Sequence, residues 1–177
     1  REAGIPTLRE IMFSGGYFIG KTTALLQLPD VLLIDYDGTS TNYAGNSISI
    51  PEIMKQHKVT LMQAQQQILK EITARKGFRF IVHDSITSLI SLLVTYATQL
   101  YNTTEEGTDK RVLTNVVLHK SFQKGHDFLE EALNQYLRPF LDLTKECAIY
   151  TAHPKTTSKI NQNNELSTPD IDLPNKI

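Results

Sequence analysis

The chain has 177 residues, 40% of them hydrophobic and 21% charged, and its 18 basic and 19 acidic residues leave a formal net charge of −1. These values fit one folded domain spanning residues 1–177 and exclude a disordered, collagen-like or coiled-coil chain. They also exclude binding to nucleic acid through bulk basicity, so any DNA-binding function needs a local basic surface.

The compartment is indicated by three features of the sequence. The longest apolar runs, such as residues 90–94, are far shorter than the roughly 20 residues of a membrane-spanning helix. Residues 1–6 lack the pattern of a signal peptide, and the single cysteine, Cys147, cannot form an internal disulfide. We therefore expect a cytoplasmic protein, of a cell or of an infected host, that has no membrane partner.

Strands and helices are expected to alternate in the first part of the chain. Residues 10–14 form an apolar run before two glycines, which predicts a buried strand entering a tight turn, and residues 21–27 favour a helix. The apolar residues 31–34 predict a strand that a parallel sheet buries on both faces. Residues 38–49 are rich in Gly, Ser, Thr and Asn and predict a long loop with room for a short strand.

The middle of the chain continues the alternation. Residues 59–76 carry apolar side chains at helical spacing, which predicts an amphipathic crossover helix. Residues 78–82 predict the next strand, which ends at an aspartate. Residues 86–101 are apolar almost all round and predict a helix buried against the sheet.

The last part is expected to hold one long helix and a fourth strand. Residues 102–126 predict a loop with room for a short helix, and Asp127 is the expected N-cap of a helix to about residue 145 that Pro139 kinks or splits. Residues 148–151 predict a strand, and the polar residues 154–176 a mobile loop. This order predicts an α/β fold with a mostly parallel sheet and right-handed crossovers.

Residues 15–22, GGYFIGKT, match the phosphate-binding pattern G-x-x-x-x-G-K-[ST] between a predicted strand and a predicted helix. Glycines let backbone N–H groups turn inward, where they bind concentrated negative charge. Lys21 is expected to reach the outer phosphates, and Thr22 to give a neutral oxygen to Mg²⁺. The alternative, a chance Gly-rich turn, is disfavoured by the complete motif. The expected cofactor-binding residues are Gly15, Gly16, Tyr17, Phe18, Ile19, Gly20, Lys21, Thr22 and Thr23.

Acidic residues follow two of the predicted strands. Asp84 can hold the hydration shell of Mg²⁺ opposite Thr22, or it can cap the next helix. Asp35 and Asp37 follow the strand at 31–34, where either can position or deprotonate an attacking water, or form a solvated turn. His153, after the last strand, can contact the γ-phosphate or lie on the surface.

The order of these parts resembles the RecA-type recombinase core over residues 11–153, and especially the short phage-encoded RecA-like recombination and annealing ATPases. The likeness is carried by the phosphate loop and by the segments LIDYD (33–37), IVHDS (81–85) and IYTAH (149–153). It implies a three-layer P-loop NTPase with a RecA-like core that hydrolyses ATP with Mg²⁺. The implied catalytic residues are Lys21, Asp37, Asp84 and His153, and the implied metal ligands are Thr22 and Asp84.

The resemblance assigns Asp37 to the position of the family's catalytic glutamate, with one methylene fewer, and His153 to the γ-phosphate sensor. It also implies a homo-oligomer with nucleotide at subunit interfaces and two loops, 102–126 and 154–176, that contact single-stranded DNA. The first loop is mildly basic and the second is balanced, and neither offers an aromatic platform for bases. Two solvated loops therefore remain the alternative.

Two other functions remain open. One is a small-molecule or nucleotide kinase with the same phosphate loop, although Arg111 and Arg138 are isolated and form no Arg-rich lid. The other is a nucleotide-gated binding module without hydrolysis, which the shorter acid at Asp37 allows. A regulatory GTPase is disfavoured because the chain contains no Asn-Lys-x-Asp motif to read guanine.

Overall fold

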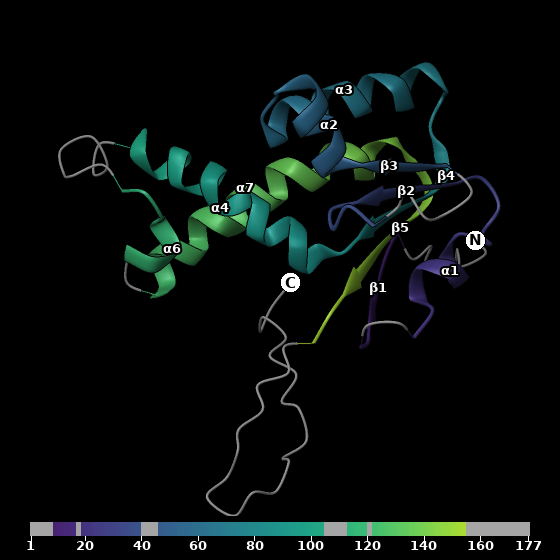
Figure 1. Cartoon of the computed structure of the whole chain (residues 1–177), viewed down its shortest axis with the longest axis horizontal. Coiled ribbons are helices and arrows are strands. Elements are labelled where there is room, and N and C mark those ends of the chain that lie inside the picture. The colour runs from purple at the N-terminus through teal and green to yellow at the C-terminus, as the bar shows by residue number, and fades with distance from the viewer. Residues whose placement is uncertain (1–8, 17–18, 40–45, 105–112, 120–121, 155–177) are drawn as a thin grey trace, which may run out of the picture.

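A computed structural model describes residues 9–16, 19–39, 46–104, 113–119 and 122–154. Within these ranges the chain forms an α/β fold around a five-stranded sheet in the order β1-β5-β4-β2-β3 (Figure 1). Every pairing between neighbouring strands is parallel, so the predicted α/β fold with a mostly parallel sheet is confirmed. The strands are β1 (Glu10–Ser14), β2 (Val31–Asp35), β3 (Ser47–Ser49), β4 (Phe78–Asp84) and β5 (Thr144–Ala152).

The helices cover both faces of the sheet, which gives the three layers expected for a P-loop NTPase. On one face, Val31 and Leu33 of β2 pack with Leu25 of α1. On the other face, Leu32 and Ile34 pack with the side chains of several helices. The helices are α1 (Lys21–Leu25), α2 (Ile50–His57), α3 (Leu61–Ala74), α4 (Ile86–Asn102), α6 (Val116–His119) and α7 (Phe122–Leu143).

The alternation of side chains along β2 explains why its sequence is a continuous apolar run. Successive residues of a strand point to opposite faces, and both faces of this sheet are covered by helices. All five residues of β2, including Asp35, are therefore buried. The other predicted strands also form, and β5 begins at Thr144, ahead of the expected start at residue 148.

The prediction that residues 10–14 are buried is wrong, although they form β1. This strand is at the edge of the sheet and pairs with β5 alone in the part of the chain that the structure describes. Met12 and Phe13 are 39% and 44% exposed. An edge strand has a neighbour on one side only, so an apolar run there does not guarantee burial.

The long C-terminal helix ends at Leu143, close to the expected residue 145, but it starts before its expected cap. It begins at Phe122 instead of after Asp127, and it continues through Pro139 without being split. A proline inside a helix costs about 3 kcal/mol through a lost hydrogen bond and a clash. Tyr136 and Phe140 of α7 are fully buried in the main core, and that burial offsets the cost of Pro139.

Helix α4 contacts β5 of the sheet, as expected, but it packs more extensively against α7. Its buried side chains recur every four residues at Leu89, Leu93 and Ala97, as expected for one face of a helix. The opposite face is polar and exposed at Ser91, Thr95 and Gln99. The helix is therefore less completely buried than its largely apolar composition suggests, because its polar side chains lie together on the side that faces solvent.

The remaining predictions are met in part. The crossover helix is α3, which begins with a capping box between Thr60 and Gln63. Of the loop predicted at 38–49, residues 40–45 lie outside the described residues and residues 47–49 form the short strand β3. Helix α2, which follows β3, has no counterpart among the predictions. The predicted loop at 102–126 contains α6 and the start of α7, and the mobile loop expected at 154–176 lies, apart from Pro154, outside the described residues. No described helix is both long and apolar enough to cross a membrane.

Candidate functional site

The candidate site lies where the carboxyl ends of four parallel strands meet. The phosphate loop follows β1, the turn at 35–38 ends β2, Asp84 ends β4 and His153 follows β5. The strand pairing places Asp35 beside Asp84 and Ser14 beside Ala152. Open α/β sheets bind ligands at this edge, since the loops there are free to carry functional side chains.

The phosphate loop is anchored at both ends. The N–H of Gly15 donates to the carbonyl oxygen of Ala152 at 3.2 Å, and Gly20 adopts a left-handed conformation with a φ of 85°. Glycine adopts that conformation at little cost. The Nζ of Lys21 donates to the carbonyl oxygens of Gly15 at 2.6 Å and Gly16 at 2.7 Å. Of the other predicted loop residues, Ile19 is 64% exposed, Thr23 lies in the first turn of α1, and Tyr17 and Phe18 lie outside the described residues.

Asp84 joins the phosphate loop to the centre of the sheet. The Thr22 hydroxyl donates to Oδ2 of Asp84 at 2.6 Å, and the Thr151 hydroxyl donates to Oδ1. Asp84 is only 7% exposed, and no described basic side chain forms an ion pair with it. The site therefore holds a buried carboxylate whose partners are neutral hydroxyl groups.

The two acidic residues after β2 have different surroundings. Asp35 is buried, and its Oδ1 accepts hydrogen bonds from the N–H groups of Asp37 at 2.8 Å and Gly38 at 3.1 Å. Asp35 therefore stabilises the turn. Asp37 is exposed, and its carboxylate accepts a hydrogen bond from the hydroxyl of Ser88 in α4. The geometry therefore favours Asp37 over Asp35 as the residue that contacts a ligand.

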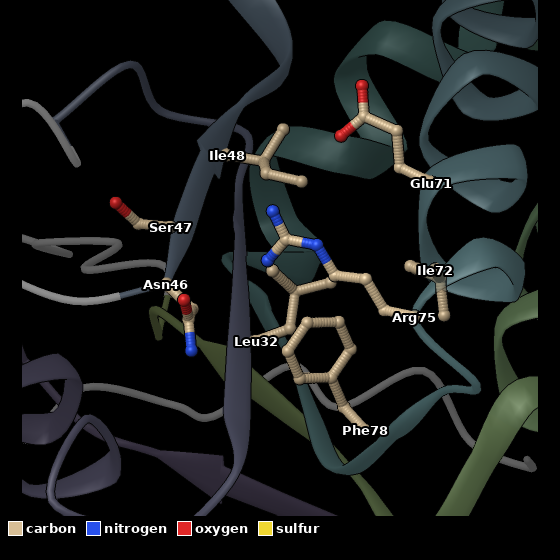
Figure 2. Close-up of a pocket in the computed structure, with 8 residues that line it drawn as sticks. All are labelled: Leu32, Asn46, Ser47, Ile48, Glu71, Ile72, Arg75 and Phe78. Atoms are coloured by element: carbon tan, nitrogen blue, oxygen red, sulfur yellow. The ribbon is translucent and has the colours of Figure 1, made fainter.

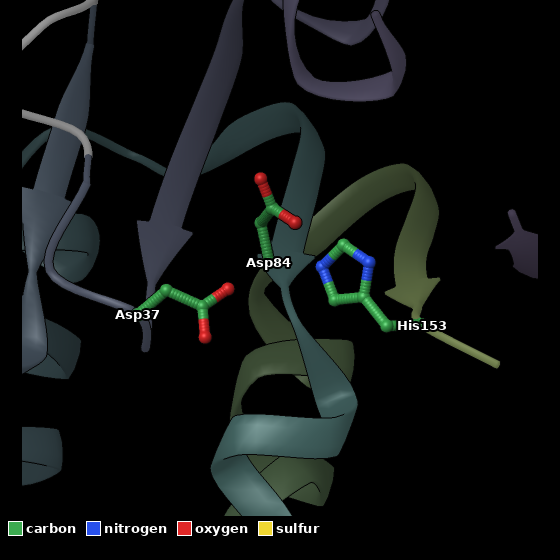
Figure 3. Close-up of side chains that lie close together, drawn as sticks. All are labelled: Asp37, Asp84 and His153. Carbon is green, nitrogen blue, oxygen red and sulfur yellow. The ribbon is translucent and has the colours of Figure 1, made fainter. Parts of the chain in front are cut away.

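His153 completes a cluster with the two aspartates. One ligand atom from each of Asp37, Asp84 and His153 lies within 4.8 Å of the other two, and Figure 3 shows the three side chains pointing toward one another. The backbone N–H of His153 donates to the hydroxyl of Thr87 at 3.2 Å. The first turn of α4 thus contacts the cluster on two sides, through Thr87 and Ser88.

The structure brings Thr22, Asp37, Asp84 and His153 to one place, with Lys21 held by the adjacent loop. Sequence reasoning missed three residues that hold this group: Thr87, Ser88 and Thr151. The available signal was the hydroxyl side chains near the two strand ends: Thr87 and Ser88 follow Asp84 by three and four residues, and Thr151 precedes His153 by two. Ser85 caps α4, so the alternative role of Asp84 as the helix cap is not what the structure shows.

A cavity lies elsewhere in the described part of the chain. It has a volume of about 290 Å³ and is shown in Figure 2. Leu32, Ser47 and Phe78 lie at or next to the starts of their strands, so the cavity is at the opposite edge of the sheet from the phosphate loop. Its lining residues are Leu32, Asn46, Ser47, Ile48, Glu71, Ile72, Arg75 and Phe78.

A comparison with known protein families agrees with this geometry. The family model for the AAA domain matches residues 9–176. The chain belongs to the AAA domain family. A search of curated proteins finds no match. The phosphate loop of this AAA domain is therefore part of a nucleotide-binding domain of the P-loop ATPase type.

Directly behind Asp84, the core of this AAA domain contains a buried histidine. His83 is fully buried, stacks between Tyr36 and Tyr150, and has its Nδ1 2.7 Å from the Tyr36 hydroxyl. Burial lowers the pKa of His83 to about 3. In the unfolded chain the imidazole takes up a proton near its ordinary pKa of about 6.5, whereas the folded chain does not. Acid therefore favours the unfolded state.

We expect this histidine to make the AAA domain sensitive to mild acid. The free energy of unfolding should fall by about 2 kcal/mol between pH 6.5 and pH 4.5 because of His83 alone. The variant His83→Asn keeps a polar group near Tyr36 but does not titrate, so its stability should lack this component. Urea unfolding of both proteins at several pH values, without metal or nucleotide, measures the difference. Parallel pH profiles for the two proteins would contradict the assignment.

Proposed function

We propose that this AAA domain hydrolyses ATP with Mg²⁺ and acts on single-stranded DNA in recombination or annealing. The observation that carries the ATPase part is the 2.6 Å hydrogen bond between Thr22 and Asp84. It joins the end of the phosphate loop to the carboxyl end of β4, 62 residues further along the chain. ATP hydrolysis requires a phosphate-binding and a metal-binding group to lie side by side in this way.

The donor set at this position fits Mg²⁺. The ion prefers oxygen ligands and keeps several of its waters, and Thr22 and Asp84 offer a hydroxyl and a carboxylate oxygen that already touch. Thr22 would hold the ion directly and Asp84 through its hydration shell. Bound Mg²⁺ supplies positive charge against the phosphate oxygens. The buried carboxylate of Asp84, which no described cation pairs with, supports a role in binding a cation.

Lys21 is positioned to bind the outer phosphates. Its ammonium group donates to two carbonyl oxygens of the loop, so it lies against the surface that the phosphates would contact. A phosphate oxygen is a stronger acceptor than a carbonyl because it carries negative charge. We infer that Lys21 exchanges these carbonyl partners for phosphate oxygens when ATP binds.

Asp37 and His153 are the proposed reacting and sensing groups. The exposed carboxylate of Asp37 can accept a proton from an attacking water, or orient that water. His153, whose ring lies within the same cluster, can donate to the γ-phosphate. Neither role requires a large movement, because both side chains already lie beside Asp84.

Ser88 should matter for turnover through its hydrogen bond to Asp37. Replacing Ser88 with alanine leaves the Asp37 carboxylate free to rotate, so we expect kcat to fall by about 10-fold with KM for ATP nearly unchanged. The variant Ser88→Thr keeps the hydroxyl and should restore most of the activity. Steady-state kinetics with Ser91→Ala as a control on the exposed face of α4 checks this. If Ser88→Thr showed the same change in kcat or KM as Ser88→Ala, the cause would be a change in helix packing instead of the lost hydroxyl.

The DNA and oligomer parts of the proposal rest on the resemblance to RecA-type ATPases. The loops at 102–126 and 154–176 would contact the strand, and the first of them is mildly basic. A homo-oligomer would place nucleotide between subunits, with Lys155 or Lys159 as the basic residue donated to the neighbouring site. A cytoplasmic location and a single domain over 1–177 belong to the same proposal.

The second candidate is a nucleotide-gated module that binds ATP without hydrolysing it. Asp37 favours it, because this side chain is one methylene shorter than the glutamate of the RecA-type family and reaches less far toward a water. A P-loop kinase is the third candidate and would need an acceptor site beside the γ-phosphate.

One experiment separates these functions. ATP turnover is measured with and without single-stranded DNA for the wild-type chain, Lys21→Ala and Asp37→Ala. DNA-stimulated turnover that both variants lose supports the proposal. Tight ATP binding without turnover supports the binding module, and phosphate transfer to an added nucleoside or metabolite supports the kinase. Turnover that is unaffected by either substitution would reject this site.

A further inference from the structure

We propose that Asp37, Asp84 and His153 form a binding site for one divalent transition-metal ion, and that this site does not require nucleotide. The three residues come from the turn after β2, the end of β4 and the residue after β5. One ligand atom from each lies within 4.8 Å of the other two (Figure 3). Two carboxylates and one imidazole are thus presented toward a common point.

The donor set separates this site from the proposed Mg²⁺ position. Mg²⁺ takes oxygen ligands, whereas an imidazole nitrogen is a preferred ligand of Zn²⁺, Co²⁺ and related ions. Two carboxylates with one histidine is a mixed set that suits such borderline ions. The Mg²⁺ position involves Thr22 and Asp84, so the two sites share Asp84 alone.

The spacing is close to what such an ion needs. Zinc binds oxygen and nitrogen at about 2.0–2.2 Å, which puts ligand atoms roughly 3–4 Å apart. The three ligand atoms of the cluster lie within 4.8 Å of one another, so each needs to move by about 1 Å at most to reach the spacing of a filled site. Asp37 is exposed and lies in a turn, so its carboxylate can make this adjustment.

The cluster is also supported by residues behind it, as metal ligands usually are. The hydroxyl of Ser88 holds Asp37, and the hydroxyls of Thr22 and Thr151 hold the two oxygens of Asp84. The backbone of His153 is held by Thr87. These contacts orient the two carboxylates and fix the backbone of His153 before any ion arrives, which reduces the entropy lost on binding.

Electrostatics favours a cation at the same point. Asp37 and Asp84 place two carboxylates close together, and Asp84 is only 7% exposed. No ion pair to either carboxylate is formed by the basic side chains that the structure describes. A divalent cation between them removes the repulsion between like charges.

The test uses the full chain, treated with a chelator and free of nucleotide. Titration with Co²⁺ should produce visible d–d absorption bands, and calorimetry with Zn²⁺ should give about one strong site per chain. His153→Asn and Asp37→Asn should each weaken binding at least about 10-fold. His57→Asn and Asp127→Asn, at exposed positions on α2 and α7, serve as matched controls and should bind like the wild type.

Three results would overturn the site: no Co²⁺ bands, Zn²⁺ affinity unchanged in His153→Asn and Asp37→Asn, or equal losses in the two controls. Circular dichroism of each variant confirms that it is folded. The readout is independent of the proposed ATPase, because Lys21→Ala should lose ATP binding and still bind Co²⁺ like the wild type. Metal binding without ATP binding in the wild type would reject only the proposed function.

Discussion

Replacing Lys21 with alanine is expected to weaken the binding of Mg-ATP by about 100-fold, since hydrogen bonds to charged groups contribute about 1.5–3 kcal/mol. Lys21 is the basic side chain of the phosphate loop, and its ammonium group already lies at the loop's carbonyl oxygens. The fold should be unaffected, because those two carbonyl contacts lie at the half-exposed surface of the loop. Calorimetric titration with Mg-ATP measures the loss.

The matched control for this prediction is Lys55→Ala. Lys55 is exposed in the last turn of α2 and distant in the fold from the phosphate loop. It should bind Mg-ATP with wild-type affinity, which separates a local effect from a change in net charge. If Lys21→Ala bound ATP as tightly as Lys55→Ala, the phosphate loop would not be the nucleotide site.

Replacing Asp84 with asparagine is expected to lower ATP turnover by about 10²–10³-fold, the loss typical of removing one electrostatic group from a catalytic site. Asparagine has nearly the same shape but no charge, so it should support Mg²⁺ poorly. One of its terminal atoms is an N–H₂ group, which cannot accept the hydrogen bonds that Thr22 and Thr151 donate to the carboxylate. Affinity for ATP should fall much less than turnover, because Lys21 and the loop remain.

Turnover measured across a range of Mg²⁺ concentrations checks the role of Asp84. Asp84→Asn should need more Mg²⁺ for half-maximal rate, while Asp127→Asn, an exposed position in α7, should match the wild type. A variant that keeps its turnover and its Mg²⁺ dependence would show that Asp84 does not take part in metal binding. The Thr22 contact would then be structural.

Much of the fold could be predicted because the central strands are buried on both faces. In an α/β chain, an apolar run such as 31–34 indicates a strand that helices cover on both faces. Strands β2 and β4 form where the sequence predicts them. The edge strand β1 has the same kind of run, yet Met12 and Phe13 are exposed. Position in the sheet, which depends on strands distant in sequence, decides this difference.

The ends of the helices were the least predictable features, because burial in the tertiary structure overrides the local preference of residues to start or stop a helix. Pro139 indicates a break, but α7 continues through it while Tyr136 and Phe140 are buried against the core. The helix also starts ahead of Asp127, its expected cap. Neither result follows from the residues of α7 considered alone.

At the site, the sequence by itself determined which residue types follow each strand: the phosphate loop, Asp84, the acidic pair of 35 and 37, and His153. It could do so because local patterns mark strand ends, and parallel strands bring these ends to one edge. Only the tertiary structure decided that Asp35 stabilises its turn while Asp37 faces the cluster, and that Ser88 and Thr151 hold the two carboxylates. The hydrogen bonds of Ser88 and Thr151 join residues from different elements, and their distances depend on how the sheet and α4 pack together.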